Sequence, residues 1–234
     1  MSLGPTITET LNRARADLRM GVPVVLSSGG ASALAVAAEV LSSDRLAELR
    51  VMGPLTLAIT ARRAETLKAR AYDGDIARIA VPADVTAAWL AGVADPNDDL
   101  RSPMKGPFRS ERDGPADIHR AAIQLAKSAR LLPAAIVLPV ADGARMAREL
   151  GLTQLDMDRA APDIARATVL HPVVSARVPM EAAEAGRLHV FRPDDGGEEH
   201  YAIEIGQPPR DRPVLARLHS ACFTGDLLGS LKCD

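Results

Sequence analysis

The two cysteines of the chain stand close to an arginine and a histidine near its C-terminal end. Cys222 and Cys233 are eleven positions apart, and Arg217 and His219 precede them with a spacing that places both on one face of a strand. Cysteine thiolates are natural zinc ligands, and a catalytic zinc usually takes three protein ligands and a water. Two cysteines alone do not define such a site. The spacing therefore fits either part of a zinc site or two reduced, partly buried thiols.

The segment around these residues resembles the signature of the GTP cyclohydrolase II family. In that family an Arg-x-His-Ser-Glu-Cys stretch is followed by Thr-Gly-Asp and then by Ser-Leu-Arg-Cys-Asp-Cys-Gly. The matching residues of this sequence are Arg217, His219, Ser220, Cys222, Thr224, Gly225, Asp226, Ser230, Leu231, Cys233 and Asp234. Lys232 replaces the usual arginine conservatively. Ala221 stands where the family commonly has glutamate, which leaves one contact near the substrate open.

The resemblance implies a site for zinc and a site for GTP. Three cysteines hold the zinc in the family, and the first two match Cys222 and Cys233, so we expect the third directly after Asp234. The residues implied to line the GTP site are Arg217, Leu218, His219, Ser220 and Ala221. The implied reaction is hydrolytic opening of the imidazole ring of GTP, with release of formate and pyrophosphate and with Mg²⁺ on the triphosphate. The later catalytic residues of the family have no match in this sequence, so we expect these 234 residues alone to be inactive.

Two alternative functions remain open at this point. One is a non-enzymatic protein in which a synthase-like domain serves assembly or regulation. The other is a cyclohydrolase-like enzyme of pyrimidine catabolism, which shares the same motifs and acts on another nucleotide. Ala221 keeps this second alternative open, because it changes a position close to the substrate.

Scattered matches in the first 180 residues resemble the dihydroxybutanone phosphate synthase domain that precedes the cyclohydrolase domain in many bacteria. They include an opening helix with Gly21 after it, and the Ala-Ala-Glu that ends at Glu39. Further matches are a helix near Ala121, the run 133–137, and the downstream residues Asp142, Met146 and Arg148.

The residues on which that synthase chemistry depends are missing. The family needs an acidic cluster after its first strand, whereas residues 27–32 read Ser-Ser-Gly-Gly-Ala-Ser without a carboxylate. Its Gly-His-Thr-Glu stretch is replaced by Asp117-Ile-His-Arg120, so a base stands in place of an acid. Without these groups neither the metal site nor the proton transfers can be assembled. We interpret His119 as a surface or cap residue and residues 27–30 as a plain turn rather than a phosphate site.

The order of elements predicts an α+β fold. A mixed β-sheet packed with helices, like that of dihydroxybutanone phosphate synthase, is followed by the first β-strands of a cyclohydrolase II domain. The predicted domains are residues 1–182, synthase-like and non-catalytic, and residues 183–234. The predicted helices are 8–20, 31–41, 61–70, 84–90, 116–130, 143–150 and 156–165; the predicted strands are 22–26, 55–60, 76–81, 134–140, 168–178, 188–192, 201–205 and 214–219.

The stretch between the fourth predicted helix and the fifth contrasts with these periodic segments. Residues 95–114 are rich in Pro, Gly, Asp, Arg and Ser, which is typical of a long surface loop. Because it has few apolar groups to bury, we expect it to be mobile. Asp84 is the expected N-cap of the helix that precedes this loop.

Composition narrows the classes of partner. The net charge of −2 gives no field that favours nucleic acid or an anionic membrane. The longest apolar runs are far shorter than the ~20 residues that span a bilayer. The N-terminus has no basic segment followed by an apolar one. We therefore expect a cytoplasmic protein without a nucleic acid or membrane partner. The resemblance implies GTP as the partner, and we expect a homodimer.

Overall fold

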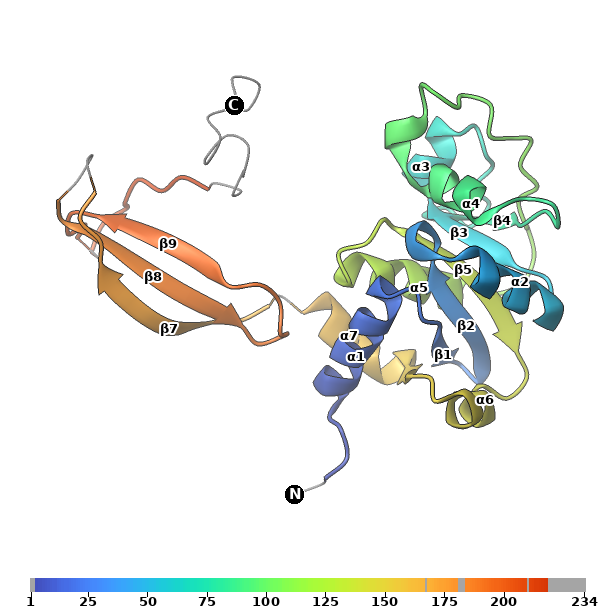
Figure 1. Cartoon of the computed structure of the whole chain (residues 1–234), viewed down its shortest axis with the longest axis horizontal. Helices are drawn as coiled ribbons and strands as arrows, with labels where there is room; N and C mark the ends of the chain where they lie inside the picture. Colours follow the sequence, from blue (N-terminus) through green and yellow to red (C-terminus); the bar gives the residue numbers. More distant parts are fainter. Residues whose placement is uncertain (1–2, 167, 181–183, 210, 219–234) are drawn as a thin grey trace. The chain divides into compact units, whose positions relative to one another are not determined.

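The computed structural model describes residues 3–166, 168–180, 184–209 and 211–218 (Figure 1). Contacts between residues divide the chain into two compact units, Met1–Ala167 and Thr168–Asp234. We describe each unit by itself.

The first unit contains a six-stranded mixed sheet in the order β4-β3-β5-β2-β1-β6 (Figure 1). β1 and β6 run parallel, whereas all other neighbours in the sheet are antiparallel. The strands are β1 Val24–Ser28, β2 Ala31–Ala37, β3 Thr56–Thr60, β4 Ile76–Ala80, β5 Ala134–Val140 and β6 Gln154–Asp156. The predicted mixed sheet is therefore confirmed.

Helices cover both faces of this sheet. One face packs against α1 Ile7–Arg19, α5 Asp117–Ser128 and α7 Met157–Ala165. The other face packs against α2 Ser43–Met52, α3 Ala61–Thr66, α4 Ala87–Ala94 and α6 Gly143–Leu150. Two short 3-10 helices, Ala38–Val40 and Pro96–Asp98, complete the unit.

The strand residues alternate between the two cores. Val25, Leu34 and Ile136 belong to the core beneath α2 and α4, while their neighbours along each strand belong to the opposite core. Alanine dominates the strand positions that face α5, which lets this helix approach the sheet closely. The chain thus builds its core with few aromatic residues, 3% of the sequence.

The start of α1 illustrates how local sequence sets an element. Thr6 is the N-cap: its side chain accepts a hydrogen bond from the backbone of Glu9, and the Glu9 carboxylate accepts one from the backbone of Thr6. This reciprocal arrangement satisfies two amide groups that a helix leaves free at its start. Leu11 and Leu18 are buried on one face, as the seven-residue spacing predicted.

The prediction of a helix over residues 31–41 is wrong. Residues 31–37 form β2, which pairs with β1 on one side and with β5 on the other. Gly29 and Gly30 connect β1 and β2 with φ values of +55° and +83°, a left-handed conformation that suits a two-residue hairpin turn. Alanine favours helix locally, but here two neighbouring strands satisfy the backbone of this segment. Of residues 27–30, which the sequence predicts as a plain turn, Gly29 and Gly30 form the turn, whereas Ser27 and Ser28 end β1.

The second unit contains an antiparallel sheet in the order β7-β8-β9 (Figure 1). Its strands are β7 Leu170–Arg177, β8 Gly186–Pro193 and β9 His200–Ile205. Since β7 pairs with β8 along its length, it belongs to the second unit by contacts. The family boundary that the sequence places at residue 182 stays a prediction.

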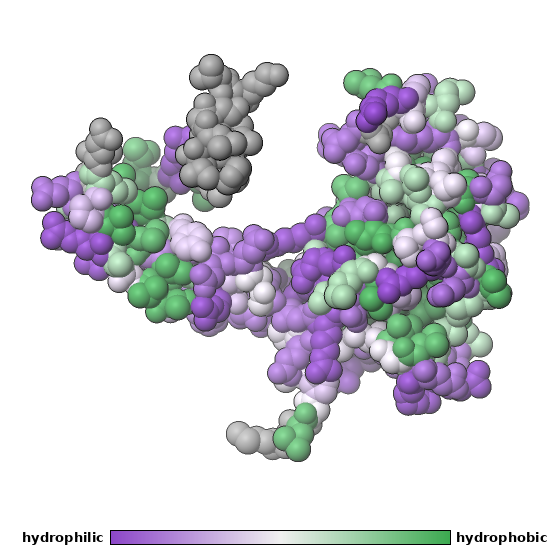
Figure 2. Space-filling model, viewed as in Figure 1, coloured by the Kyte–Doolittle hydropathy of each residue, from purple (hydrophilic) through white to green (hydrophobic). Residues whose placement is uncertain are grey.

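One face of the three-stranded sheet is apolar. Val174 lies opposite Val190, which lies opposite Tyr201, and Leu188 lies opposite Ile203. Figure 2 shows hydrophobic residues at the surface of this unit. Val174, Tyr201 and Ile203 are exposed within the described structure.

Among the described residues, none of the helices combines the length and the apolar character that crossing a membrane requires.

Candidate functional site

Arg217 and Leu218 are the two predicted GTP-site residues that the structure describes. They lie in the segment 213–218, which has no regular secondary structure, and both are exposed. The predicted strand over 214–219 is therefore wrong for residues 214–218. The remaining predicted residues, His219, Ser220, Ala221, Cys222 and Cys233, lie outside the described residues.

Both predicted zinc ligands, Cys222 and Cys233, lie outside the described residues, so only the chemistry of their side chains bears on the zinc prediction. Among the residues that the structure describes, no group of three or more His, Cys, Asp or Glu side chains could hold a metal ion. The two cysteines of the sequence are soft thiolate donors, the type of ligand that zinc accepts. The zinc site at Cys222 and Cys233 stays a prediction.

Residues 27–32, where the synthase resemblance implies an acidic cluster, lie in the β1–β2 hairpin. The Ser28 hydroxyl donates to Asp158 Oδ1 at 2.7 Å, and the Gly29 amide donates to Asp158 Oδ2 at 3.1 Å. These bonds, from Ser28 first and then from Gly29, hold the pKa of Asp158 below its usual range. Both oxygens of this carboxylate therefore accept hydrogen bonds from the hairpin.

Arg120, which stands where the synthase family has glutamate, forms a structural clamp. Its Nε lies 2.9 and 3.0 Å from the two carboxylate oxygens of Asp75, and its Nη2 donates to the carbonyl of Asp73 at 3.0 Å. The guanidinium thus ties the start of α5 to the turn that precedes β4. Glu39 is also used structurally, because it accepts a hydrogen bond from the backbone amide of Leu132 at 2.7 Å.

The interpretation of His119 as a surface or cap residue is wrong, because its side chain is buried with 8% of the residue exposed. Neither ring nitrogen has a hydrogen-bond partner within the described structure. Burial lowers the pKa of His119, and the positive charge of Arg78 lowers it further. The polar residues Asp117 and Arg120 beside this histidine gave no sign of burial, and the charged groups that act on its pKa, Arg78, Glu111 and Asp73, all lie outside α5.

Arg78 is a site that the sequence analysis missed. It is a buried arginine within the otherwise apolar strand β4. Its guanidinium binds both carboxylate oxygens of Asp73, at 2.8 and 3.0 Å, and the carbonyls of Asp113 and Gly114. The sequence contained one signal for this site, an arginine with Ile and Ala on both sides of it. A charged residue in such an apolar strand is buried only when it is paired, so the pattern indicates a buried ion pair.

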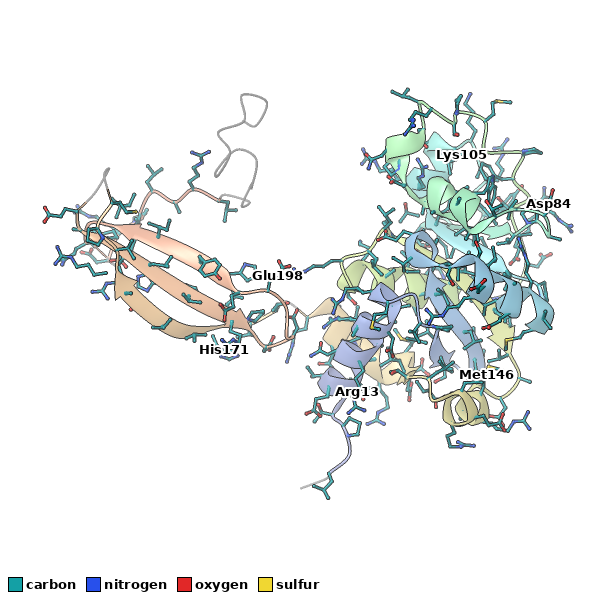
Figure 3. All side chains as sticks on the ribbon, viewed as in Figure 1. Arg13, Asp84, Lys105, Met146, His171 and Glu198 are labelled. Carbon is teal, nitrogen blue, oxygen red and sulfur yellow. The ribbon has the colours of Figure 1, made fainter. Side chains whose placement is uncertain are left out.

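Residues 95–114 contain little regular structure, but hydrogen bonds attach them at several points to the rest of the first unit. Asp99 accepts hydrogen bonds from Arg63 and Lys105, and Trp89 donates its indole N–H to the carbonyl of Lys105 at 3.2 Å. Figure 3 labels Lys105 in this segment. The predicted long loop is confirmed in position. These buried contacts favour a packed rather than a mobile segment.

The same segment covers the free edge of β4. The amide of Ala80 donates to the carbonyl of Arg109 at 2.9 Å, and the amide of Glu111 donates to the carbonyl of Arg78 at 2.8 Å. An edge strand with free backbone groups can pair with other chains, and covering it prevents such pairing.

The prediction of Asp84 as a helix cap is wrong. Asp84 is exposed (Figure 3), and the N-cap of α4 is Thr86 instead.

Comparison with protein families identifies the C-terminal part of the chain. Residues 171–234 match the family GTP cyclohydrolase II. This match includes β7, β8, β9 and the complete cysteine-containing segment. It begins close to the division between the two compact units, at residues 167 and 168.

Curated relatives match the chain over almost its whole length. A GTP cyclohydrolase-2 of Azospirillum brasilense is 40% identical over 96% of this chain and 60% of the relative. A GTP cyclohydrolase-2 of Xylella fastidiosa is 33% identical over 99% of this chain and 56% of the relative. The riboflavin biosynthesis protein RibBA of Aquifex aeolicus is 30% identical over 60% of this chain and 38% of the relative. The chain thus spans less than two thirds of these relatives.

The fold of the first unit also has a match among solved structures. A 3,4-dihydroxy-2-butanone 4-phosphate synthase in its cation-free form superimposes with a TM-score of 0.50 and 16% identity, covering 68% of this chain and 97% of that chain. At this identity the likeness concerns the fold alone. Residues 171–234 therefore match the GTP cyclohydrolase II family, and they follow a unit with the fold of a 3,4-dihydroxy-2-butanone 4-phosphate synthase.

Proposed function

We propose that the protein containing this chain opens the imidazole ring of GTP by zinc-dependent hydrolysis, with release of formate and pyrophosphate, in riboflavin biosynthesis. The observation that supports this most is the family match over residues 171–234, which contains the Arg217–Cys222 and Ser230–Asp234 motifs. The relatives named GTP cyclohydrolase-2 and RibBA favour this activity over the pyrimidine-catabolic alternative.

Cys222 and Cys233 are proposed to hold the zinc, with a third ligand from outside these 234 residues. Their thiolates fit this metal better than they fit magnesium or calcium, which prefer oxygen. A zinc ion at such a site supplies a water of lowered pKa for hydrolysis at neutral pH.

Arg217, Leu218, His219, Ser220 and Ala221 are proposed to contact GTP. The planar guanidinium of Arg217 suits two phosphate oxygens at once, and its exposure in segment 213–218 leaves it accessible to a ligand. Mg²⁺ is proposed to accompany the triphosphate and to offset its charge. Ala221 lacks the carboxylate that the family commonly has, so the neighbouring side chains must carry more of the contact.

The synthase-like domain of the sequence-based division, residues 1–182, is proposed to be non-catalytic. Three observations support this. The hairpin between β1 and β2 carries no carboxylate, Asp158 accepts hydrogen bonds from that hairpin, and Arg120 stands in place of an acid. The relative with 40% identity includes this unit and is named for GTP cyclohydrolase-2 alone. A homodimer in the cytoplasm, where thiols stay reduced, fits this proposal.

The zinc and cyclohydrolase proposals are tested together on a protein that spans the whole length of the GTP cyclohydrolase-2 relatives. We expect about one zinc per chain and GTP-dependent formate release. Cys222→Ser should abolish both, because a serine hydroxyl is a poor zinc ligand. Full zinc content without Cys222, or equal formate release by the two proteins, refutes the site.

The GTP contact is tested in the same protein with Arg217→Ala and Arg212→Ala as matched substitutions. Arg217→Ala should retain zinc but lower kcat/KM for GTP by about 2–3 kcal/mol, the cost of losing a charge-assisted contact. Arg212→Ala removes the same charge five residues earlier and should leave kcat/KM unchanged. An equal loss in both variants would mean that general charge, not a specific contact, matters.

The proposal for the first unit is tested with ribulose 5-phosphate and excess Mg²⁺. We expect no formate from this substrate, because the groups for metal binding and proton transfer are missing. Formate above the background of a heat-treated sample contradicts the proposal.

A further inference from the structure

Arg78 is the centre of a buried polar cluster that no step of the proposed reaction uses. We call Asp73, Arg78, Glu111 and His119 the Arg78 latch. The side chain of Arg78 is 3% exposed, and it holds Asp73 on one side and the carbonyls of Asp113 and Gly114 on the other. This one guanidinium therefore attaches segment 109–114 to β4.

His119 closes the latch from the side of α5. Ala58 of β3 and Ile76 of β4 pack with Ala116 and Ile123, and Arg78, two residues after Ile76, faces the same side of the sheet. His119 lies on the first turns of α5, between Ala116 and Ile123 in sequence. Its ring is buried there without a hydrogen bond to either nitrogen within the described residues.

A neutral imidazole fits this position, whereas a charged one does not. Charging His119 brings a second buried cation into the field of Arg78, at the N-terminal end of a helix, where the macrodipole also disfavours positive charge. An imidazolium also carries two N–H donors, and both would need acceptors in a buried place.

The carboxylates whose charge acts on His119 are already engaged. Asp73, from the turn before β4, is bound by Arg78 through both oxygens. Glu111, from segment 109–114, accepts from the Thr56 hydroxyl at 2.7 Å and lies 3.6 Å from Arg78. Asp117 and Arg120, on α5 itself, are paired with each other. Glu111 is the less tightly held of the two carboxylates that act on His119.

We propose that His119 is a proton-sensitive release for segment 109–114: a charged ring repels Arg78, which holds the carbonyls of Asp113 and Gly114, and draws Glu111 away from Thr56, so that the segment detaches from the edge of β4. The released surface is the backbone edge of Ala80 and Arg78, which segment 109–114 covers in the closed state. Protonation of His119 therefore exposes the backbone edge of β4.

The direction of the pH effect follows from linkage. The pKa of His119 is lowered from 6.5 in the folded protein by burial and by Arg78, so the closed latch binds fewer protons than the open one. The closed state is fully favoured above pH 6.5, and it loses stability as the pH falls below that value. The equilibrium constant for opening rises by at most about tenfold per pH unit in this range.

Hydrogen exchange of the intact 234-residue chain between pH 7.5 and pH 5.5 tests the proposal. After correction for the intrinsic exchange rate, amides of residues 109–120 should lose protection below pH 6.5 by up to about tenfold per unit. Amides of β1, β2 and β5 should keep theirs. An equal loss over the whole unit means global unfolding and overturns the proposal.

Two variants make the assignment specific. His119→Gln keeps a neutral polar group of similar size and should remove the pH dependence in residues 109–120. His171→Gln, at an exposed histidine of β7 (Figure 3), should leave that pH dependence intact. An unchanged pH dependence in His119→Gln overturns the proposal.

A measurement on the wild type covers the case that His119→Gln does not fold. The ring proton signals of His119, followed by NMR, give the pH at which this histidine takes up a proton. Protection of residues 109–114 should fall with the same midpoint. Protection that persists after His119 is charged overturns the proposal.

Discussion

The two units of the chain differ in how they are stabilised and in where they carry chemistry. The first unit buries a six-stranded sheet between two layers of helices, whereas the three-stranded sheet of the second leaves β7 exposed along its whole length. Yet the family motifs with cysteine, histidine and arginine belong to the second. In this chain, the part with the larger core has the fold of a synthase, but it has no carboxylate in residues 27–32, where the sequence resemblance implies an acidic cluster. A well-packed fold is therefore no evidence of the activity associated with it.

The largest expected effect separates the two units by core truncation. Ile136→Ala removes a side chain that is 1% exposed between β2 and β3, and it should destabilise the first unit by about 2–5 kcal/mol. Ile203→Ala truncates the same side chain at a position 63% exposed on β9, and it should cost at most about 0.5 kcal/mol. Urea unfolding followed by circular dichroism measures both. Equal costs would show that the sheet of the second unit is covered in solution.

A smaller effect comes from two glycines of the first unit. An added Cβ at Gly143 meets Ser32 Cβ at 2.7 Å and Val25 Cγ1 at 2.8 Å, so Gly143→Ala should destabilise by about 1–3 kcal/mol through overpacking. At Gly92, within α4, the nearest atom lies at 3.9 Å, and Gly92→Ala should stabilise by about 0.5–1 kcal/mol. Thermal unfolding of the two variants should shift in opposite directions. An upward shift for Gly143→Ala would contradict the close packing of α6 on the hairpin, and a downward shift for Gly92→Ala would contradict the open space beside α4.

The smallest effects compare one carboxylate in each unit. Hydrogen bonds from Arg63 and then from Lys105 hold the pKa of Asp99 well below its usual range. The resulting stability is present above about pH 3.8 and is lost as the pH falls further. At pH 7, Asp99→Asn should cost about 1–2 kcal/mol and make residues 95–114 more sensitive to trypsin. Glu199→Gln breaks an exposed pair with Arg192 and should cost at most about 0.5 kcal/mol. Rapid cleavage of the wild-type segment would support the mobile loop that the sequence predicts.

Local sequence determined the elements whose signals lie within a few residues of each other. The first helix, predicted over 8–20, the apolar run 134–140 and the helix 143–150 are found close to their predicted bounds, because the periodicity and the capping groups that set them are local. The cysteine-containing motif likewise identified the family, since it is a contiguous pattern that needs no fold to be recognised.

Tertiary structure decided the features that depend on distant partners. Ala31–Ala37 is a strand because β1 and β5 satisfy its backbone, and this outweighs the helical preference of alanine. His119 is buried in the folded unit, and the charged groups that act on it, Arg78, Glu111 and Asp73, come from outside its own helix. Segment 95–114 is attached through Asp99 to Arg63, thirty-six positions earlier. No local pattern contains such contacts, because the energy of burial and pairing arises only when the chain has folded.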